Sequence, residues 1–408
     1  MEILQEMENL IKELLDVYGS PLYIYDANKL RQNINHISAS VRYDRTQFRF
    51  ASVTNGNVAL LKIFKDCGWG LHANTPGDVY LGLQAGFNPE KVVYSGSNLN
   101  SDEMLMVLKW GVRTFNLDSV SQVKLFCQVY GLWNEPQRTQ RTQREEVREV
   151  RLGLRLNFPE LTGDSRIGVH PDDFGKASSI ARDAGLKVNG LHFYRGTGTN
   201  ATTAFTQAIE SVFSVAGKLP DWEYLDFGGG FGYPYRHGGA AFDWEFFGAE
   251  LTRCLEKLNN SIELVIEPGR AAIAGCAILL AKVVSVKWQS EKQIVGVDTT
   301  VANLSVPSVH GGYREIIAYP SSTSSDLYQT DVCGNTTYSR DYLGKNCLLP
   351  ALNINDIIAI LDVGAYGYAM SSHFLHRPRP AEVLIENGNH RLIRKREDYS
   401  VLLANQII

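Results

Sequence analysis

The chain has 408 residues, 44% hydrophobic and 21% charged, a composition typical of a globular protein with room for two domains. Its formal net charge of -4 argues against nucleic acid or an anionic membrane as a partner of the whole surface. No apolar run has the length of a membrane span, and the acidic start lacks the regions of a signal peptide. We therefore expect a cytoplasmic protein.

The cysteines form no CxxC pair and no cluster with histidine. A zinc or iron–sulfur site is therefore not expected, and most of the thiols are expected to be small buried side chains. The six are Cys67, Cys127, Cys254, Cys276, Cys333 and Cys347.

The first predicted element is a helix over residues 3–18, where apolar residues recur at helical spacing. Gly19, Ser20 and Pro21 end it. Residues 22–25 (LYIY) then predict a strand, and Asp26 could cap the helix that follows.

From about residue 48 to 266, short apolar runs alternate with helical patterns. Eight such βα units favour an α/β fold of the TIM-barrel type over a doubly wound sheet, which needs fewer strands. The predicted strands are 48–53, 69–73, 91–95, 113–117, 150–156, 188–194, 223–227 and 262–266.

Residues 134–149 interrupt this alternation because they are polar and charged without an apolar face, which predicts a mobile surface insertion. After Pro268 the helical alternation ends, and predicted strands at 276–287, 292–298, 327–333, 356–362 and 381–388 indicate a mostly β domain. We expect a barrel over 26–266 and a β domain made of 1–25 and 267–408, with the strand at 22–25 joining it.

A glycine cluster, Gly228, Gly229 and Gly230, closes one predicted barrel strand. Glycines let backbone N–H groups approach an anion, and a phosphate site late in a barrel is a common arrangement. A tight turn without a ligand is the alternative.

Two further strand ends carry polar side chains. Glu267 and Arg270 suit a ligand with a cationic nitrogen and an anionic group, although a salt bridge at the domain junction explains them equally. Tyr366 could reach a phosphate or substrate, or could simply plug an aromatic core. His72, His192 and His310 lie at or near predicted strand ends without metal-ligand spacing. This favours ordinary hydrogen-bonded histidines, while a converging cluster stays open.

The ordered set of motifs resembles the pyridoxal-phosphate decarboxylases of the alanine-racemase-like fold, which include diaminopimelate, ornithine and arginine decarboxylases. The resemblance runs from about residue 20 to 390. It rests on GSPLYIYD, LHFYRGTGT, LDFGGGFGYPY, IEPGR, VDTTVANLSVPSVHGGYREI and LDVGAYGYAMSSHFLHRPRPAEVLI.

The resemblance implies a barrel plus a β domain in an obligate homodimer, with each active site at a barrel mouth and completed by the partner's β domain. It implies that Glu267 pairs with the pyridine nitrogen of the cofactor. It also implies a set of phosphate contacts: Thr197, Gly228, Gly229, Gly230, Arg270 and Tyr366.

The chain departs from this family where the covalent chemistry should be. The family's Schiff-base lysine lies in a motif like AVKAN, and the matching residues 51–55 read ASVTN, with Val53 at the lysine position. Residues 50–61 contain no lysine. Other matching positions also differ. In the barrel, His72 stands where the family has an acid, and Tyr194, which is followed by Arg195, stands where it has the ring-stacking histidine. In the β domain, Thr337 replaces the catalytic cysteine, Tyr338 replaces the substrate-sensing acid, and Val306 replaces an arginine.

Two main hypotheses follow. The first is a protein that keeps the phosphate pocket, has lost conventional decarboxylation, and binds a metabolite or regulates an active paralogue in a heterodimer. The second is an enzyme with rewired chemistry on an amino-acid-derived or phosphate-bearing substrate. It would use non-covalent pyridoxal phosphate or no cofactor, with His72, Tyr194, Arg195, Thr337 and Tyr338 as candidate working groups. An active decarboxylase with a lysine supplied from elsewhere is the third and least favoured.

Overall fold

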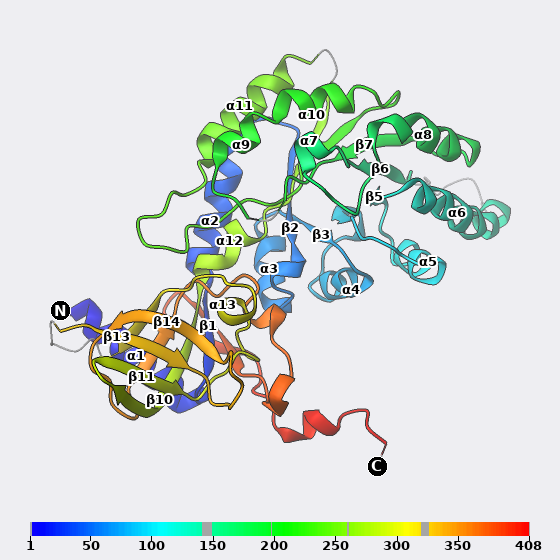
Figure 1. Cartoon of the computed structure of the whole chain (residues 1–408). Coiled ribbons are helices and arrows are strands. Elements are labelled where there is room, and N and C mark those ends of the chain that lie inside the picture. Colours follow the sequence, from blue (N-terminus) through cyan, green and yellow to red (C-terminus); the bar gives the residue numbers. More distant parts are fainter. Residues whose placement is uncertain (1, 141–148, 197, 259–260, 320–325, 408) are drawn as a thin grey trace. The chain divides into compact units, whose positions relative to one another are not determined.

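The computed structural model describes residues 2–140, 149–196, 198–258, 261–319 and 326–407 (Figure 1). The chain divides into two units. The barrel unit comprises Asn33–Tyr233 and Ala240–Ala272, and the β unit comprises Met1–Gln32, Pro234–Gly239 and Ile273–Ile408. Residues 26–32 and the loop 234–239 therefore group with the β unit, and residues 267–272 group with the barrel.

Eight parallel strands close the barrel in sequence order, as the sequence predicts (Figure 1). They are β2 (Thr46–Ala51), β3 (Gly70–Ala73), β4 (Val92–Tyr94), β5 (Thr114–Leu117), β6 (Arg151–Arg155), β7 (Val188–His192), β8 (Tyr224–Asp226) and β9 (Glu263–Ile266). Each lies inside the corresponding predicted range or within two residues of it. Parallel strands need a crossover between neighbours, and the helices supply it.

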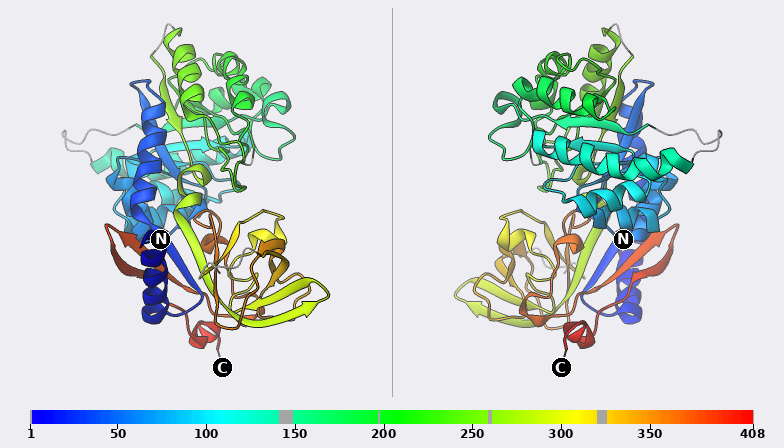
Figure 2. Two further views of the ribbon diagram at one scale, coloured as in Figure 1. Left: turned by 90° about the vertical axis from the view of Figure 1, so that its left-hand side faces the viewer. Right: turned by 90° about the vertical axis from the view of Figure 1, so that its right-hand side faces the viewer.

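Helices surround the strand ring (Figure 2). The longer ones in this unit are α3 (Val58–Asp66), α4 (Pro76–Gln84), α5 (Ser101–Lys109), α6 (Val120–Gln140), α8 (Phe174–Asp183), α10 (Ile209–Ala216) and α11 (Trp244–Glu256). Their starts carry recognisable caps: the Asn57 side chain accepts from the Ala59 amide at α3, and Thr75 and Asp78 form a capping box at α4. Phe50 of β2 stacks on Phe64 of α3 at 3.7 Å between ring centroids, which fixes that helix against the barrel wall.

The predicted surface insertion at 134–149 begins inside a helix. Helix α6 continues through Gln140, so the first half of the segment is helical. Residues 141–148 lie outside the described part of the chain.

The β unit is built on one sheet with the path β14-β13-β11-β10-β1-β16-β17, to which β12 and β15 are added. Strand β1 (Leu22–Asp26) pairs antiparallel with β10 (Ala277–Gln289) and parallel with β16 (Ala381–Glu386), which confirms that the N-terminal strand joins this domain. The others are β11 (Lys292–Val297), β12 (Ile316–Tyr319), β13 (Tyr328–Cys333), β14 (Tyr342–Leu349), β15 (Ile357–Ile360) and β17 (Asn389–Arg394).

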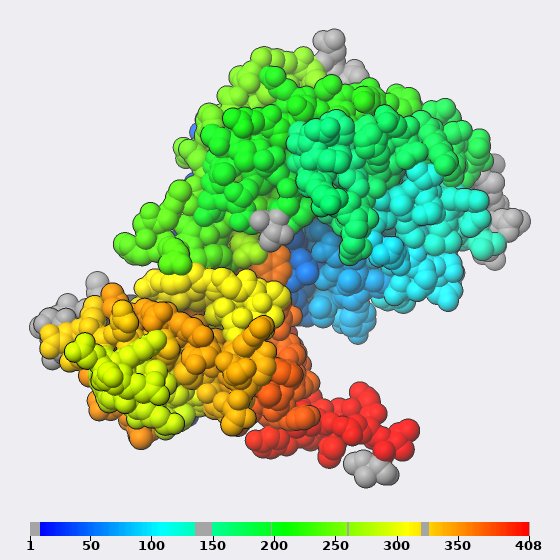
Figure 3. Space-filling view, viewed as in Figure 1, coloured from blue at the N-terminus to red at the C-terminus, as the bar shows by residue number. Residues whose placement is uncertain are grey.

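Helix α1 (Glu2–Tyr18) covers this sheet through its predicted apolar stripe, with Leu14 and Leu15 packed against Leu280 and Val383. Asp26 accepts a hydrogen bond from the Lys29 amide at 2.9 Å, as expected of a cap for α2 (Ala27–Ser40). The C-terminal segment, red in Figure 3, is exposed. No helix within the described ranges is long and apolar enough to span a bilayer.

Candidate functional site

Polar side chains gather inside the barrel where the strands end. His72 is on β3, Arg155 on β6, His192 on β7 and Asp226 on β8, and Glu267 directly follows β9. Arg155 pairs in register with His192, and His192 with Asp226, so these strands reach the mouth at one level. We call these five residues the mouth cluster.

Glu267 is the centre of the mouth cluster. Its Oε2 lies 3.5 Å from His72 Nε2 and 3.4 Å from His192 Nε2. The Glu267 side chain is only 2% exposed. The strand ends therefore bring together two histidines that are 120 residues apart in sequence (192 − 72), and the converging cluster is the interpretation that the structure supports.

Asp226 is held from two sides. Its Oδ2 accepts a hydrogen bond from Asn116 Nδ2 at 2.9 Å, and its Oδ1 accepts one from the Gly228 amide at 3.0 Å. Asn116 in turn accepts from the Tyr224 hydroxyl at 2.9 Å through Oδ1. This buried chain of hydrogen bonds fixes the carboxyl group at the start of the glycine turn.

Burial controls the protonation of the mouth cluster. It raises the pKa of Glu267 to about 7, against the opposing charges of Arg155 and Arg49. Burial, then the neighbouring Glu267, raises the pKa of Asp226 well above its usual range. Burial lowers the pKa of His192 to about 4 and, with the neighbouring His192, lowers that of His72 as well. At neutral pH both histidines are thus uncharged.

Several atoms of this cluster lack hydrogen bonds. Within the described residues, neither ring nitrogen of His72 or His192 makes one, and neither does Glu267 Oε1. Leaving a buried polar group unsatisfied costs about 1–3 kcal/mol, so these atoms offer partners to the polar atoms of a ligand or of water. An aromatic nitrogen that donates to Glu267 fits this set.

The glycine turn after β8 needs glycine at each position. A Cβ at Gly228 would lie 2.1 Å from the Phe193 carbonyl oxygen, and one at Gly230 would lie 2.3 Å from that of Gly196. Gly228 and Gly230 also have positive φ, at 65° and 94°. The amides of Gly229 and Gly230 donate to no other described residue, so they are available to an anion.

Arg270 lies beside this turn at the start of α12 (Arg270–Ile273). A Cβ built on Gly198 would lie 3.1 Å from Arg270 Nε, so the guanidinium borders the loop that contains Gly196 and Gly198. That loop pairs with the glycine turn, where the Thr199 amide donates to the Gly230 carbonyl at 3.1 Å. Turn and guanidinium together offer a cradle of N–H donors, which is what a phosphate requires.

The remaining barrel residues are placed as follows. Tyr194 lies under Arg155, whose Cζ is 5.1 Å from the ring centroid, and Arg195 is half-buried in the next position. Thr197 lies outside the described residues. Val53 is in a 3₁₀ turn, Ser52–Thr54, directly after β2, and its side chain is 44% exposed.

Three candidates belong to the β unit. Thr337 and Tyr338 lie in the loop before β14; Thr337 is exposed, and the Tyr338 ring packs edge-on against Phe374 at 5.5 Å. The loop is organised by the buried Asp341, whose carboxylate accepts from the Val301 amide at 2.7 Å. Tyr366 has a positive φ of 59°.

A metal ion is the other species that the mouth cluster could hold. His192, Asp226 and Glu267 each offer one ligand atom, and these atoms lie within 4.8 Å of one another. The expectation of no metal site rested on cysteine and histidine spacing along the chain, and it stays a prediction.

Sequence reasoning missed Arg155, Asn116 and Asp226 as members of the site. Each occupies an inward position on a barrel strand, and a polar residue at an inward position of a buried strand is the signal that could have identified them.

The comparisons with known proteins agree with this geometry. The family model for the pyridoxal binding domain of the pyridoxal-dependent decarboxylases matches residues 28–274. A diaminopimelate decarboxylase of Methanothermobacter thermautotrophicus is 31% identical over 97% of this chain and 93% of its own. One from Aquifex aeolicus is 28% identical over 96% of this chain and 93% of its own.

Solved structures share the fold. One from Aquifex aeolicus has a TM-score of 0.85 and 27% identity, and covers 97% of this chain and 94% of that one. The M. jannaschii diaminopimelate decarboxylase, solved with L-lysine, has a TM-score of 0.86 and 23% identity, with 97% and 94% covered. The chain therefore belongs to the pyridoxal-dependent decarboxylase family, of the alanine-racemase-like fold.

Proposed function

We propose that the barrel unit binds pyridoxal phosphate, or a ligand that likewise joins a phosphate to an aromatic nitrogen, without a covalent bond. We further propose that conventional decarboxylation is lost, which leaves a metabolite-binding or regulatory role in the cytoplasm. The observation that carries this proposal is Val53, an apolar side chain at the strand end where relatives of this fold are expected to have a reactive lysine.

The chain's own residues divide the binding task. Glu267 would accept from the ring nitrogen, while the amides of Gly229 and Gly230 and the Arg270 guanidinium would hold the phosphate. By the family resemblance, Thr197 and Tyr366 would add phosphate contacts. When bound through an amine, pyridoxal phosphate supplies an electron sink for the bonds at an amino acid's α-carbon.

Among the described residues, the cations that act on the pKa of Glu267 are arginines and not lysines. They are the guanidinium groups of Arg155 and Arg49. An arginine stays protonated and is no nucleophile in a protein. Lys65, on α3, lies 3.3 Å from Asp66 in an ion pair of its own.

The test of this proposal is the spectrum and mass of the purified chain with added pyridoxal phosphate. We expect saturable binding, no mass increase after borohydride reduction, and no carbon dioxide from diaminopimelate, lysine, ornithine or arginine. Diaminopimelate comes first because the relatives at 31% and 28% identity are named for it. A pyridoxyl-lysine peptide or release of carbon dioxide would overturn the proposal.

A second candidate function, rewired catalysis, is favoured by His72. This ring is buried, makes no hydrogen bond with a described residue, and lies 3.5 Å from Glu267. Its uncharged ring offers a nitrogen lone pair that can accept a hydrogen bond from a substrate, while the lowered pKa of His72 makes the ring a weak base at neutral pH. Tyr194, Arg195, Thr337 and Tyr338 are the further candidate working groups of this hypothesis.

Screening phosphate-bearing amino-acid derivatives for turnover tests this second function. Any activity found should fall in His72→Ala and Arg195→Ala but not in the control Arg391→Ala, an exposed residue of β17. Wild-type rates in both site variants would exclude it.

Assembly is part of the proposal. We propose a homodimer, or a heterodimer with an active paralogue that this chain regulates. Native mass spectrometry of the chain purified from its source cell measures the number and identity of the subunits, and a monomer without a partner would contradict both forms.

A further inference from the structure

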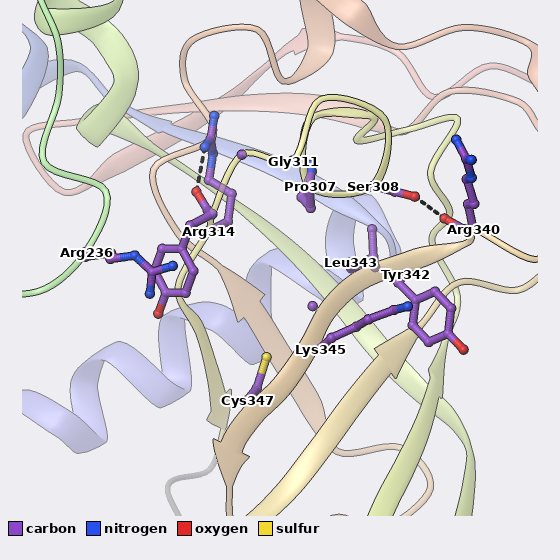
Figure 4. A pocket seen from close by; sticks show the side chains of 13 residues that line it. Arg236, Pro307, Ser308, Gly311, Arg314, Arg340, Tyr342, Leu343, Lys345 and Cys347 are labelled. Atoms are coloured by element: carbon purple, nitrogen blue, oxygen red, sulfur yellow. Dashed lines mark hydrogen bonds between the residues drawn. The ribbon is translucent and has the colours of Figure 1, made fainter. Parts of the chain in front are cut away.

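A second cavity, of about 440 Å³, lies within the β unit and shares no lining residue with the mouth cluster (Figure 4). Four cationic side chains line it. Arg236 comes from the loop 234–239, Arg314 precedes β12, Arg340 precedes β14, and Lys345 is on β14. We call this cavity the Arg314 pocket.

Two crossed contacts build one wall of the Arg314 pocket. The Arg314 guanidinium carbon lies 3.8 Å from the Tyr235 ring centroid, and that of Arg236 lies 4.1 Å from the Tyr313 ring centroid. Arg314 Nη1 also donates to the Tyr313 carbonyl at 2.7 Å (Figure 4). These contacts hold the loop 234–239 in place and keep a guanidinium that is only 3% exposed in the wall of the cavity.

The opposite rim is formed by α13 (Val306–Val309) and the start of β14. The Ser308 hydroxyl donates to the Arg340 carbonyl, which joins the two segments (Figure 4). Lys345 Nζ lies 3.9 Å from the Tyr342 ring centroid, and both Arg340 and Lys345 are exposed. Two exposed positive charges, those of Arg340 and Lys345, thus border an opening, and the buried Arg314 lies in its wall.

The charge of the residues that line this pocket is opposite in sign to the net charge of the chain. The chain as a whole carries -4, yet no Asp or Glu is among the residues that line the cavity. The Glu315 carboxylate nearby accepts from the Tyr313 hydroxyl at 2.5 Å. Four cations around one concave surface repel each other and raise the local concentration of anions.

Cys347, whose thiol lines the cavity, is not a reactive cysteine. Burial raises the pKa of the Cys347 thiol, the sulfur that lines the cavity, to about 11. The thiol is therefore protonated at neutral pH and is a poor nucleophile.

We propose that the Arg314 pocket binds a small organic anion with at least two negative charges, a phosphate ester being the chemistry that guanidinium groups match best. The cavity volume lies in the range of small-molecule sites, roughly 300–1,000 Å³. This site lies in a different unit from the proposed cofactor cradle, so it gives the chain a metabolite site that does not depend on the missing lysine.

Calorimetric titration of the full chain with pyrophosphate and, separately, citrate tests the proposal. All variants carry Arg270→Ala, which removes the barrel's own anion ligand. We expect saturable pyrophosphate binding in this background. We expect it to weaken about two- to fivefold in Arg340→Ala and in Lys345→Ala, as loss of one exposed charged contact implies. The control is Lys287→Ala, which removes an exposed cation of the same unit outside the pocket.

Comparison of citrate with pyrophosphate shows whether the pocket prefers carboxylate or phosphate as the anionic group. Weaker binding of either probe in Arg340→Ala supports the proposed site. Equal affinity in the pocket variants and in Lys287→Ala would overturn the proposal, as would the absence of saturable binding by both probes. Because Arg340 and Lys345 are exposed, neither variant should affect folding, and circular dichroism checks this. The result is independent of whether pyridoxal phosphate binds in the barrel.

Discussion

At the scale of single residues, the proposed loss of covalent chemistry rests on Val53. This residue follows β2 in a turn whose other two residues, Ser52 and Thr54, are buried, but Val53 itself is 44% exposed, so a longer side chain can extend there without displacing the core. We expect Val53→Lys to gain what the wild type lacks, a borohydride-stable mass increase of one pyridoxyl group on the new lysine. Peptide mass spectrometry after reduction measures it.

The matched control for this gain is Val284→Lys. Val284 is 48% exposed on β10, so the same substitution adds the same amine at a solvated site away from the barrel strands. An adduct in both variants would mean ordinary surface labelling. Its absence from Val53→Lys, with pyridoxal phosphate bound, would show that Val53 is not at the lysine position.

The backbone conformation of Gly230 leads to a second prediction at this scale. Its φ is 94°, and an added Cβ would meet the Gly196 carbonyl oxygen at 2.3 Å. We expect Gly230→Ala to cost about 1–3 kcal/mol of folding stability and to abolish phosphate binding, because the turn must shift. Urea unfolding and calorimetry measure the two effects.

Gly185→Ala is the control that separates the cost of a positive φ from that of the close approach to Gly196. Its φ is also positive, at 74°, but nothing lies within 4 Å of an added Cβ. Gly185→Ala should therefore show the backbone cost without loss of phosphate binding. Equal stability losses in the two variants would mean that the close approach to Gly196 contributes nothing.

At the scale of elements, the barrel could be predicted because each strand is a short apolar run between turns. Local pattern carries that information. What surrounds Glu267 could not be predicted, because His72 and His192 meet it only after eight strands close into a ring, and sequence spacing does not report that convergence. The fold was thus predictable strand by strand, while the mouth cluster depends on tertiary structure.

Three strands of the β unit were not predicted: β12, which has four residues, and β14 and β17, which have a common physical feature. β14 and β17 are polar terminal strands of the sheet path, with exposed residues such as Lys345 and Arg391, so their hydrophobic alternation is weak. The extension of α6 through Gln140 was missed because helix formation there continues past its apolar face.

Glu397, which follows β17 and contacts the segment before β16, allows a prediction about the dependence of stability on pH. Glu397 accepts from Arg379 Nε at 2.8 Å and lies 2.7 Å from His373 Nε2. Burial opposes ionisation, but these hydrogen bonds outweigh it and lower the pKa of Glu397 from its usual 4.5 to about 2. A carboxyl group whose pKa is lower in the folded than in the unfolded chain stabilises the fold at a pH above the unfolded pKa. This contribution is lost as the pH falls from about 4.5 through 2.

We therefore expect Glu397→Gln to lower the free energy of unfolding at pH 7 by about 2 kcal/mol, the scale of charged hydrogen bonds. The difference in unfolding free energy between this variant and the wild type should become smaller below pH 4.5, the usual pKa of this carboxyl group. Urea midpoints across pH measure it. Glu291→Gln, at an exposed turn residue, is the control and should give no such difference. A difference independent of pH would mean that Glu397 acts through packing.

At the scale of the whole molecule, the two units carry different parts of the proposed function. The cofactor cradle and mouth cluster belong to the barrel unit, whereas Thr337, Tyr338 and Tyr366 belong to the β unit. In the family that this chain resembles, the β domain completes the partner's active site. The β unit of this chain would then contribute Thr337 where an active partner's site needs a cysteine.

This arrangement predicts a gain of activity that only a mixed assembly can show. If the chain pairs with an active paralogue, Thr337→Cys should raise the decarboxylation rate per active subunit of the co-purified complex, because the thiol enters the paralogue's site. The same variant alone should stay inactive, since its own barrel still carries Val53. Ser339→Cys places a thiol at another exposed position of the same loop and should change neither rate. A rate gain in both cysteine variants would indicate a nonspecific thiol effect, and no gain in a stable complex would place Thr337 away from the partner's chemistry.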